Sequence, residues 1–124
     1  MNLKELWNKA IEEHNALEYH EAHELFEDLW LELDDRQEKD IVQTLAQADA
    51  LAVHIKTGNI GAAQRLMRQL PELVQTFPPD HNGIDLREMK VWINQMISDI
   101  PPVGEFPEME LDHPEPPKLT QSRS

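Results

Sequence analysis

Residues 38–56, EKDIVQTLAQADALAVHIK, decide the fold of this chain. Apolar side chains cover most of the helical circumference of this stretch, at Ile41, Val42, Leu45, Ala46, Ala48, Ala50, Leu51, Ala52, Val53 and Ile55. A helix that is apolar nearly all round usually lies at the centre of a domain, where its neighbours cover every face. Gly58 follows as a C-terminal stop and Asn59 as an N-cap for the next helix. The stretch therefore predicts a central buried helix.

Amphipathic helices are expected on both sides of this central helix. Apolar residues recur at helical spacing over 3–14 and 18–33 before it, and over 60–77 and 86–100 after it. Pro71 kinks or restarts the helix over 60–77, and no stretch alternates apolar and polar residues as a strand does. Short connections indicate antiparallel neighbours. We therefore expect an all-α fold, a compact bundle of about five antiparallel-neighbour helices.

The chain divides by composition into a domain and a tail. Its 124 residues are an ordinary size for one domain, and we expect the helical domain to span residues 1–100. From residue 101 onward, six of 24 residues are proline and acidic residues are frequent. This composition favours a Pro-rich acidic tail over residues 101–124 that is extended or disordered.

Charge and cysteine content limit the partners and the compartment. The formal net charge is -13, and residues 1–50 alone hold 14 acidic and 4 basic residues. An acidic protein repels phosphate groups, so we expect no nucleic acid and no membrane as partner, and leave a protein partner open. Absence of cysteine excludes disulfides and thiolate metal sites. Without a signal-peptide pattern or an apolar stretch near 20 residues, we expect a cytoplasmic protein.

A polar cluster on the helix over 18–33 is the chemically suggestive feature. His23 and Glu27 lie one turn apart, so both can hold one divalent metal or act as an acid/base pair, with Glu24 beside them. On the central helix, Gln47 and His54 lie two turns apart and would face this cluster. A buried polar group needs a partner, so we expect a buried polar cluster between these two helices.

Other histidines are weaker candidates. His14 stands at the end of the first helix, where we expect it at the surface. His20 shares a face with His23, and whether it joins the cluster is left open.

Three motifs follow one another along the chain. The first is Tyr19-His20-Glu21-Ala22-His23-Glu24 with Glu27 and Trp30. The second comprises Leu45, Gln47, Ala48, Ala50, Leu51 and His54, then Gly58-Asn59 and Gly61-Ala62, and the third is Gly83-Ile84-Asp85-Leu86. Together they resemble the prokaryotic domain-of-unknown-function family 309, whose signature FEAHE…E…W is similar to the first motif. The resemblance covers about residues 5–100, and the family usually has glycine where this chain has Leu17.

The resemblance implies an all-helical fold but no established activity. It implies that the positions of interest are Glu21, His23, Glu24, Glu27, Trp30, Gln47 and His54.

Three functions stay open at this point. The first is a structural or interaction protein with a buried His/Glu cluster. The second is a small metal-dependent hydrolase-like enzyme, with His23, Glu27 and His54 as metal ligands and Glu24 as general base. The third is a metal-free small-molecule binder or acid/base enzyme, whose pocket or polar network would include Glu21, Trp30 and Gln47.

Overall fold

Six α-helices make up most of the computed structural model, which describes residues 2–102, 104 and 115–122. They are α1 (Leu3–Asn15), α2 (Tyr19–Glu32), α3 (Arg36–Thr57), α4 (Ile60–Leu66), α5 (Leu70–Gln75) and α6 (Arg87–Asp99). The all-α prediction is confirmed. The helix expected over 60–77 is two helices, because Pro71 cannot donate inside a helix but suits the first turn of α5.

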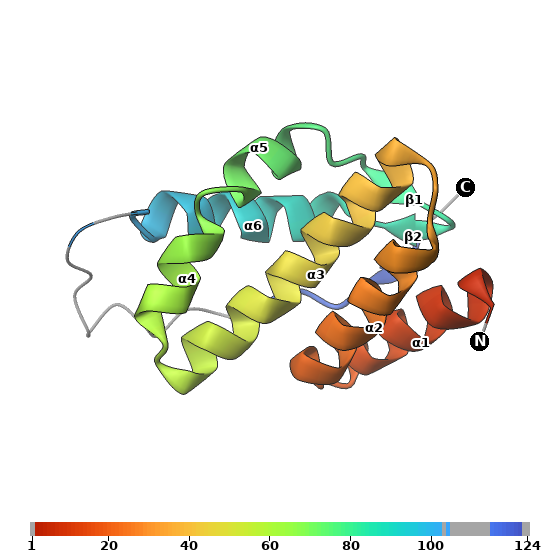
Figure 1. Cartoon of the computed structure of the whole chain (residues 1–124), viewed down its shortest axis with the longest axis horizontal. Coiled ribbons are helices and arrows are strands. Elements are labelled where there is room, and N and C mark those ends of the chain that lie inside the picture. The colour runs from red at the N-terminus through yellow and green to blue at the C-terminus, as the bar shows by residue number, and fades with distance from the viewer. Residues whose placement is uncertain (1, 103, 105–114, 123–124) are drawn as a thin grey trace.

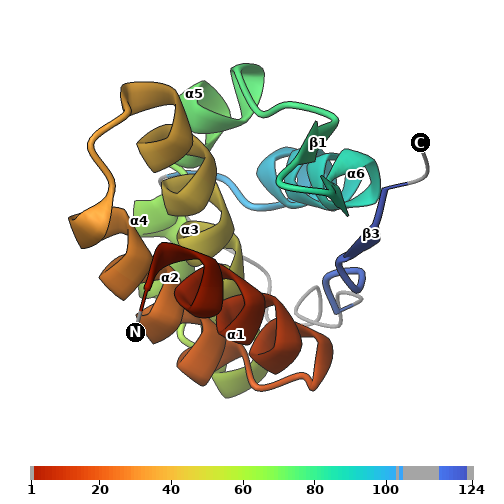
Figure 2. The same cartoon turned by 90° about the vertical axis from the view of Figure 1, so that its right-hand side faces the viewer.

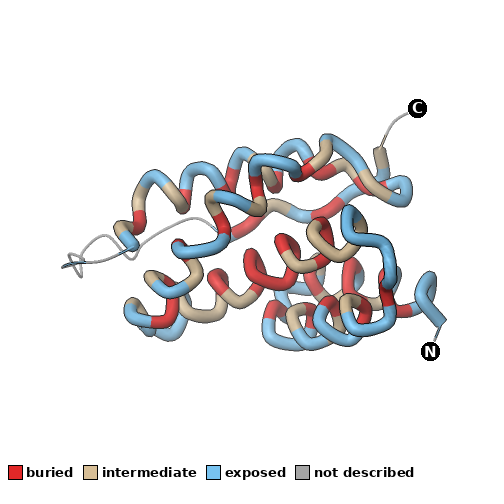
Figure 3. The backbone as a smooth tube through the Cα atoms, turned by 45° about the horizontal axis from the view of Figure 1, so that its top comes forward, coloured by how far each residue is buried: buried red, intermediate tan, exposed pale blue. Residues whose placement is uncertain are grey.

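Helix α3 crosses the middle of the molecule and contributes many of the buried residues of the core. Helices α1 and α2 lie on one side of it, and α4, α5 and α6 on the other (Figure 1). The most extensive packing joins α2 to α3 and α1 to α2. Buried residues run along α3 (Figure 3), among them the fully buried Leu45, Ala48 and Leu51. Within the part of the chain that the structure describes, no helix has the length and apolarity that crossing a membrane requires.

Local signals end the helices where the chain turns. Asp35 begins α3 by accepting a hydrogen bond from the Glu38 amide at 2.9 Å. Gly58 ends α3 in the left-handed conformation, with φ of 74°. Between α1 and α2, Leu17 takes a left-handed φ of 65°, which glycine adopts without steric cost. Because leucine has a Cβ atom and glycine does not, the backbone of this turn is strained at Leu17.

A small antiparallel sheet is the part of the fold that the sequence analysis missed. Its strands β1 (Asp80–His81), β2 (Ile84–Asp85) and β3 (Thr120–Gln121) pair in the order β1-β2-β3. Strands of two residues are too short to show an alternating pattern.

Strand β3 comes from the expected tail. Residues 115–122 pass beside α1 to reach the β1–β2 hairpin (Figure 2). The tail prediction also covers 103, 105–114 and 123–124, which lie outside the described residues.

Candidate functional site

A groove of about 310 Å³ between α2 and α3 contains several of the predicted site residues. Its lining consists of His23, Glu27, Trp30, Leu31, Gln43, Ala46 and Gln47. Residues of α2 supply one wall and residues of α3 the other, because these two helices pack along each other. The groove thus combines an aromatic and an aliphatic surface with amide, imidazole and carboxylate groups.

His23 is held in one orientation at the groove. Its Nδ1 lies 2.8 Å from the Ala46 carbonyl oxygen, and its Nε2 lies 2.9 Å from Glu27 Oε1. A carbonyl oxygen only accepts, so Nδ1 carries a proton and Nε2 is the nitrogen that faces Glu27. The His23 side chain is 24% exposed and that of Glu27 61%, so the pair sits at the rim of the groove.

Trp30 and Gln47 form the inner part of the groove. Gln47 donates from Nε2 to Gln69 Oε1 at 2.7 Å, which ties α3 to the start of α5. Lys39 lies over the Trp30 ring, with its Nζ 3.9 Å from the ring centroid. The buried atoms Trp30 Nε1 and Gln47 Oε1 have no hydrogen-bond partner among the described residues. Beside the groove, one donor and one acceptor are therefore buried without a described hydrogen-bond partner.

The remaining predicted residues lie outside the groove lining. His54 is partly buried; burial, then the charges of His23 and Arg65, lower its pKa. Glu24 instead pairs with His20, with 3.0 Å between Oε1 and Nε2, and both side chains are exposed. Glu21 is exposed as well. His20 is therefore exposed at the surface, and it contacts Glu24, the candidate general base, rather than His23.

The three predicted metal ligands are not brought together as a set. His23 and Glu27 are in contact, but among residues 2–102, 104 and 115–122 no three His, Cys, Asp or Glu side chains form a group that could hold a metal ion. The metal site at His23, Glu27 and His54 stays a prediction.

A buried histidine–carboxylate pair lies elsewhere, between α1 and α3. His14 Nδ1 lies 2.6 Å from Asp49 Oδ1, and both side chains are 1% exposed. His14 Nε2 lies 2.8 Å from the Pro117 carbonyl oxygen. The expected surface position of His14 is therefore wrong, because its side chain contacts Asp49 of α3 through one ring nitrogen and Pro117 of the C-terminal segment through the other, and it is 1% exposed. Burial also distinguishes this pair from the rim pair His23–Glu27.

Hydrogen bonding determines where the protons of this pair lie. The Pro117 carbonyl can only accept, so His14 Nε2 donates to it, and a second proton is shared between Nδ1 and Asp49 Oδ1. Burial alone would lower the pKa of His14, but the hydrogen bond and charge of Asp49, with the Pro117 carbonyl, outweigh burial and raise it. The buried pair is therefore neutral as a unit.

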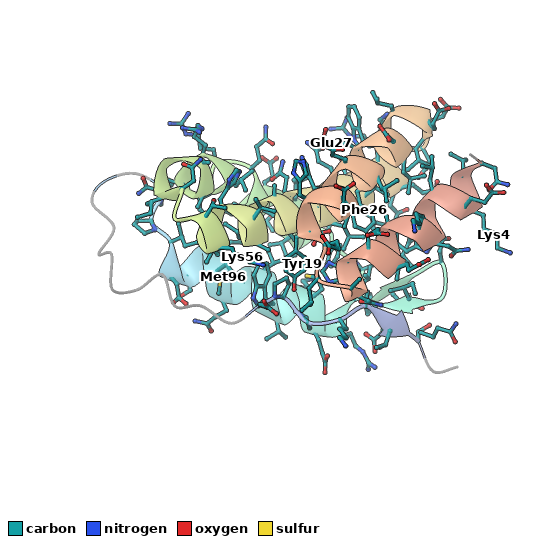
Figure 4. The ribbon with its side chains drawn as sticks, turned by 90° about the horizontal axis from the view of Figure 1, so that it is seen from below. Lys4, Tyr19, Phe26, Glu27, Lys56 and Met96 are labelled. Carbon is teal, nitrogen blue, oxygen red and sulfur yellow. The ribbon has the colours of Figure 1, made fainter. Side chains whose placement is uncertain are left out.

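Tyr19 completes this buried region. Its ring packs edge-on against His14 with the centroids 5.5 Å apart, and its hydroxyl has no partner among the described residues. Burial, with the charges of Glu115 and Asp49, raises the pKa of Tyr19 to about 12. Tyr19 lies on the inner side of α2 and Glu27 on its outer side; both are labelled in Figure 4.

One sequence signal could have revealed the buried pair. Asp49 is a charged residue in a helix that is apolar nearly all round, and a buried carboxylate requires a partner. The signal does not identify that partner, because His14 is 35 residues away in sequence.

Comparison with known protein families gives a match over about half of this chain. Residues 7–66 match the model of a family described as Domain of unknown function (DUF309). This match includes α2, α3 and the whole groove lining, and it ends before the third motif at 83–86. No curated protein matches the chain. Over residues 7–66 the chain therefore resembles the DUF309 family, as the first two motifs indicate.

Proposed function

We propose that this chain is a protein-interaction domain that binds a basic side chain of a partner in the groove between α2 and α3. The observation that carries the proposal is the groove itself, in which Glu27 stands at the rim beside Trp30 and Leu31. Lysine and arginine have apolar stems and charged heads, so they match a groove with an apolar wall and a carboxylate at its edge.

The size of the groove supports a side chain as its occupant. Its volume of about 310 Å³ is at the lower end of the range for small-molecule sites, roughly 300–1,000 Å³. A large cofactor would not be enclosed, whereas one long side chain of a partner would be. Leu31, which is 70% exposed, extends the apolar surface beside the groove.

Charge supports a basic partner. Helix α2 carries five carboxylates, at Glu21, Glu24, Glu27, Asp28 and Glu32, and no lysine or arginine. An acidic surface of this kind attracts a cationic segment and accelerates its association. Glu27 Oε1 already faces His23, so Oε2 is the oxygen that would accept from a guanidinium of the partner.

A titration with matched peptides tests this proposal. The probe is a short arginine- and alanine-rich peptide, and the same peptide with glutamine in place of arginine is its control. Calorimetry on the wild-type protein should show binding of the arginine peptide only. In NMR spectra, the Trp30 indole N–H and the Gln47 side-chain amide should shift.

Two exposed carboxylates of α2 provide a matched pair of variants. Glu27→Gln should weaken binding about fivefold, which corresponds to roughly 1 kcal/mol for a rim-exposed charge pair. Glu24→Gln removes the same charge outside the groove and should weaken binding less than about twofold. Equal losses in the two variants would mean that the peptide senses only the general charge of α2, and the groove proposal would fail.

The two enzyme alternatives have less geometric support. Glu24, the candidate general base, pairs with His20 instead of lining the groove. His54 does not complete a ligand group with His23 and Glu27 among the described residues. Metal analysis of the untagged protein, with His23→Ala for comparison, tests the metal alternative directly.

A further inference from the structure

A cavity of about 470 Å³ lies apart from the groove, at the end of the molecule that faces the viewer in Figure 2. The start of α1, the end of α2, the start of α3 and the β1–β2 hairpin each contribute residues to its lining. No residue of this lining also lines the groove between α2 and α3. The volume falls within the range of small-molecule sites, roughly 300–1,000 Å³. A small molecule therefore matches the cavity in size.

Apolar side chains form one part of the lining. Leu29, Leu33 and Val42 are buried, and all three belong to the hydrophobic core. Leu3, in contrast, is 46% exposed although it lines the same cavity. A ligand with an apolar group would rest on the buried side chains and cover part of Leu3, and such burial of apolar surface favours binding.

Trp7 gives the cavity an aromatic wall that is fixed in place. Its ring packs edge-on against Phe26, with the centroids 6.1 Å apart, and against His81 of β1, with the centroids 5.5 Å apart. A side chain that is already held in one orientation loses little conformational freedom when a ligand packs against it. The wall is therefore prepared for a ligand before one binds.

Two opposite charges line the same cavity without forming an ion pair. Lys4 comes from the first turn of α1 and is labelled in Figure 4, and Glu38 comes from the first turn of α3. Neither belongs to any ion pair among the described residues, whereas Lys9, further along α1, pairs with Glu13 at 3.0 Å. A ligand that carries both a carboxylate and an ammonium group can therefore pair with both residues.

We propose that this cavity binds a free amino acid with an apolar side chain. The carboxylate of the ligand pairs with Lys4, its ammonium group pairs with Glu38, and its side chain packs on the apolar lining beside Trp7. Charge favours this ligand class over its neighbours. Glu38 repels a simple carboxylate and Lys4 repels a simple amine, whereas an amino acid satisfies both charges. The proposal is independent of the groove and of its partner.

Leucine and two of its analogues test the proposal. The first analogue, 4-methylpentanoate, lacks the ammonium group, and the second, 3-methylbutylamine, lacks the carboxylate, while all three share one branched apolar group. Each compound is titrated into the full chain, and NMR follows the Trp7 indole N–H signal. Leucine should shift this signal to saturation and bind about fivefold more tightly than either analogue. Equal affinity for leucine and either analogue, or no shift with leucine, would overturn the proposal.

Charge-removing variants show which residue contacts which group of the ligand. Glu38→Gln should weaken leucine binding about fivefold and should not weaken binding of 4-methylpentanoate, which has no ammonium group to lose a partner. Lys4→Gln should weaken leucine binding by a similar factor and should not weaken binding of 3-methylbutylamine. If either variant weakens leucine and the corresponding analogue equally, that charge does not pair with the ligand group assigned to it, and the proposal fails.

Controls separate the cavity from general charge and from apolar binding. Glu12→Gln and Lys56→Gln remove the same charges at exposed positions outside the cavity, so leucine binding should stay within about twofold of wild type. Losses as large as those of Glu38→Gln and Lys4→Gln would overturn the proposal. Glycine carries both charges without an apolar side chain and should bind more weakly than leucine. Equal affinity for glycine and leucine would show that the apolar lining takes no part, which also contradicts the proposal.

Discussion

The buried pair of His14 and Asp49 predicts how the stability of this protein depends on pH. The perturbation that reveals it is Asp49→Asn. In the wild-type chain the pair shares one proton between Nδ1 and Oδ1, which are 2.6 Å apart. In the variant, the new amide can donate to Nδ1 while Nε2–H still donates to Pro117, so His14 stays neutral with both nitrogens satisfied. The variant therefore loses the shared proton but keeps the geometry.

The sign of the effect follows from the raised pKa of His14. An unfolded histidine has a pKa of 6.5, so the folded chain keeps a proton at pH values where the unfolded chain has lost it. The stabilisation is present in full below pH 6.5 and is lost as the pH rises through the folded-state pKa. In that window the free energy of unfolding falls by up to about 1.4 kcal/mol per pH unit, the value for one proton.

Urea denaturation at a series of pH values measures this effect. The quantity to plot is the free energy of unfolding of the wild-type chain minus that of Asp49→Asn, which cancels the other titrating groups. The difference should favour the wild type in acid and shrink as the pH rises above 6.5. Glu24→Gln, at an exposed pair, is the control and should stay within about 0.5 kcal/mol of wild type at every pH.

A difference that stays constant across the pH range, or that grows as the pH rises, would refute the reasoning. It would mean that the folded chain holds no additional proton at His14.

Three further predictions concern stability. Leu17→Gly should raise the free energy of unfolding by about 0.5–1 kcal/mol in urea denaturation, because it relieves a left-handed leucine; unchanged or lower stability would show that the turn is unstrained. Asn15→Ala should lower the free energy of unfolding by about 2 kcal/mol and speed hydrogen exchange of the Leu119 amide, since both hydrogen bonds between the Asn15 side chain and the Leu119 backbone are lost; normal protection of that amide would argue against these two hydrogen bonds. Tyr19→Phe should raise the melting temperature, with a gain of about 1 kcal/mol, because it removes a buried hydroxyl without a described partner; a lower melting temperature would indicate that the hydroxyl is satisfied.

The helical framework is largely readable from sequence because its signals are local. The apolar circumference of α3 predicts its central position, and Gly58 and Asn59 mark the boundary that follows. Pro71 predicts an interruption, although whether it kinks one helix or separates two depends on how α4 and α5 pack on α3. Each of these signals acts within one or two helical turns, which is the range over which sequence patterns determine structure.

The candidate groove is only partly predictable. One-turn spacing correctly places Glu27 beside His23, because that contact lies within a single helix. The partners across helices differ from expectation: His23 contacts the Ala46 carbonyl, and Gln47 contacts Gln69. Such contacts depend on the rotation and the relative shift of two packed helices, which helical periodicity does not specify.

By itself, the sequence determined an all-α architecture with a buried central helix and an acidic second helix. Only the tertiary structure decided that the buried histidine is His14, that its partner is Asp49, and that residues 115–122 close over it. The physical reason is the range of the interactions. Helix formation depends on neighbours along the chain, whereas burial of a charged pair depends on which surfaces meet when distant segments pack.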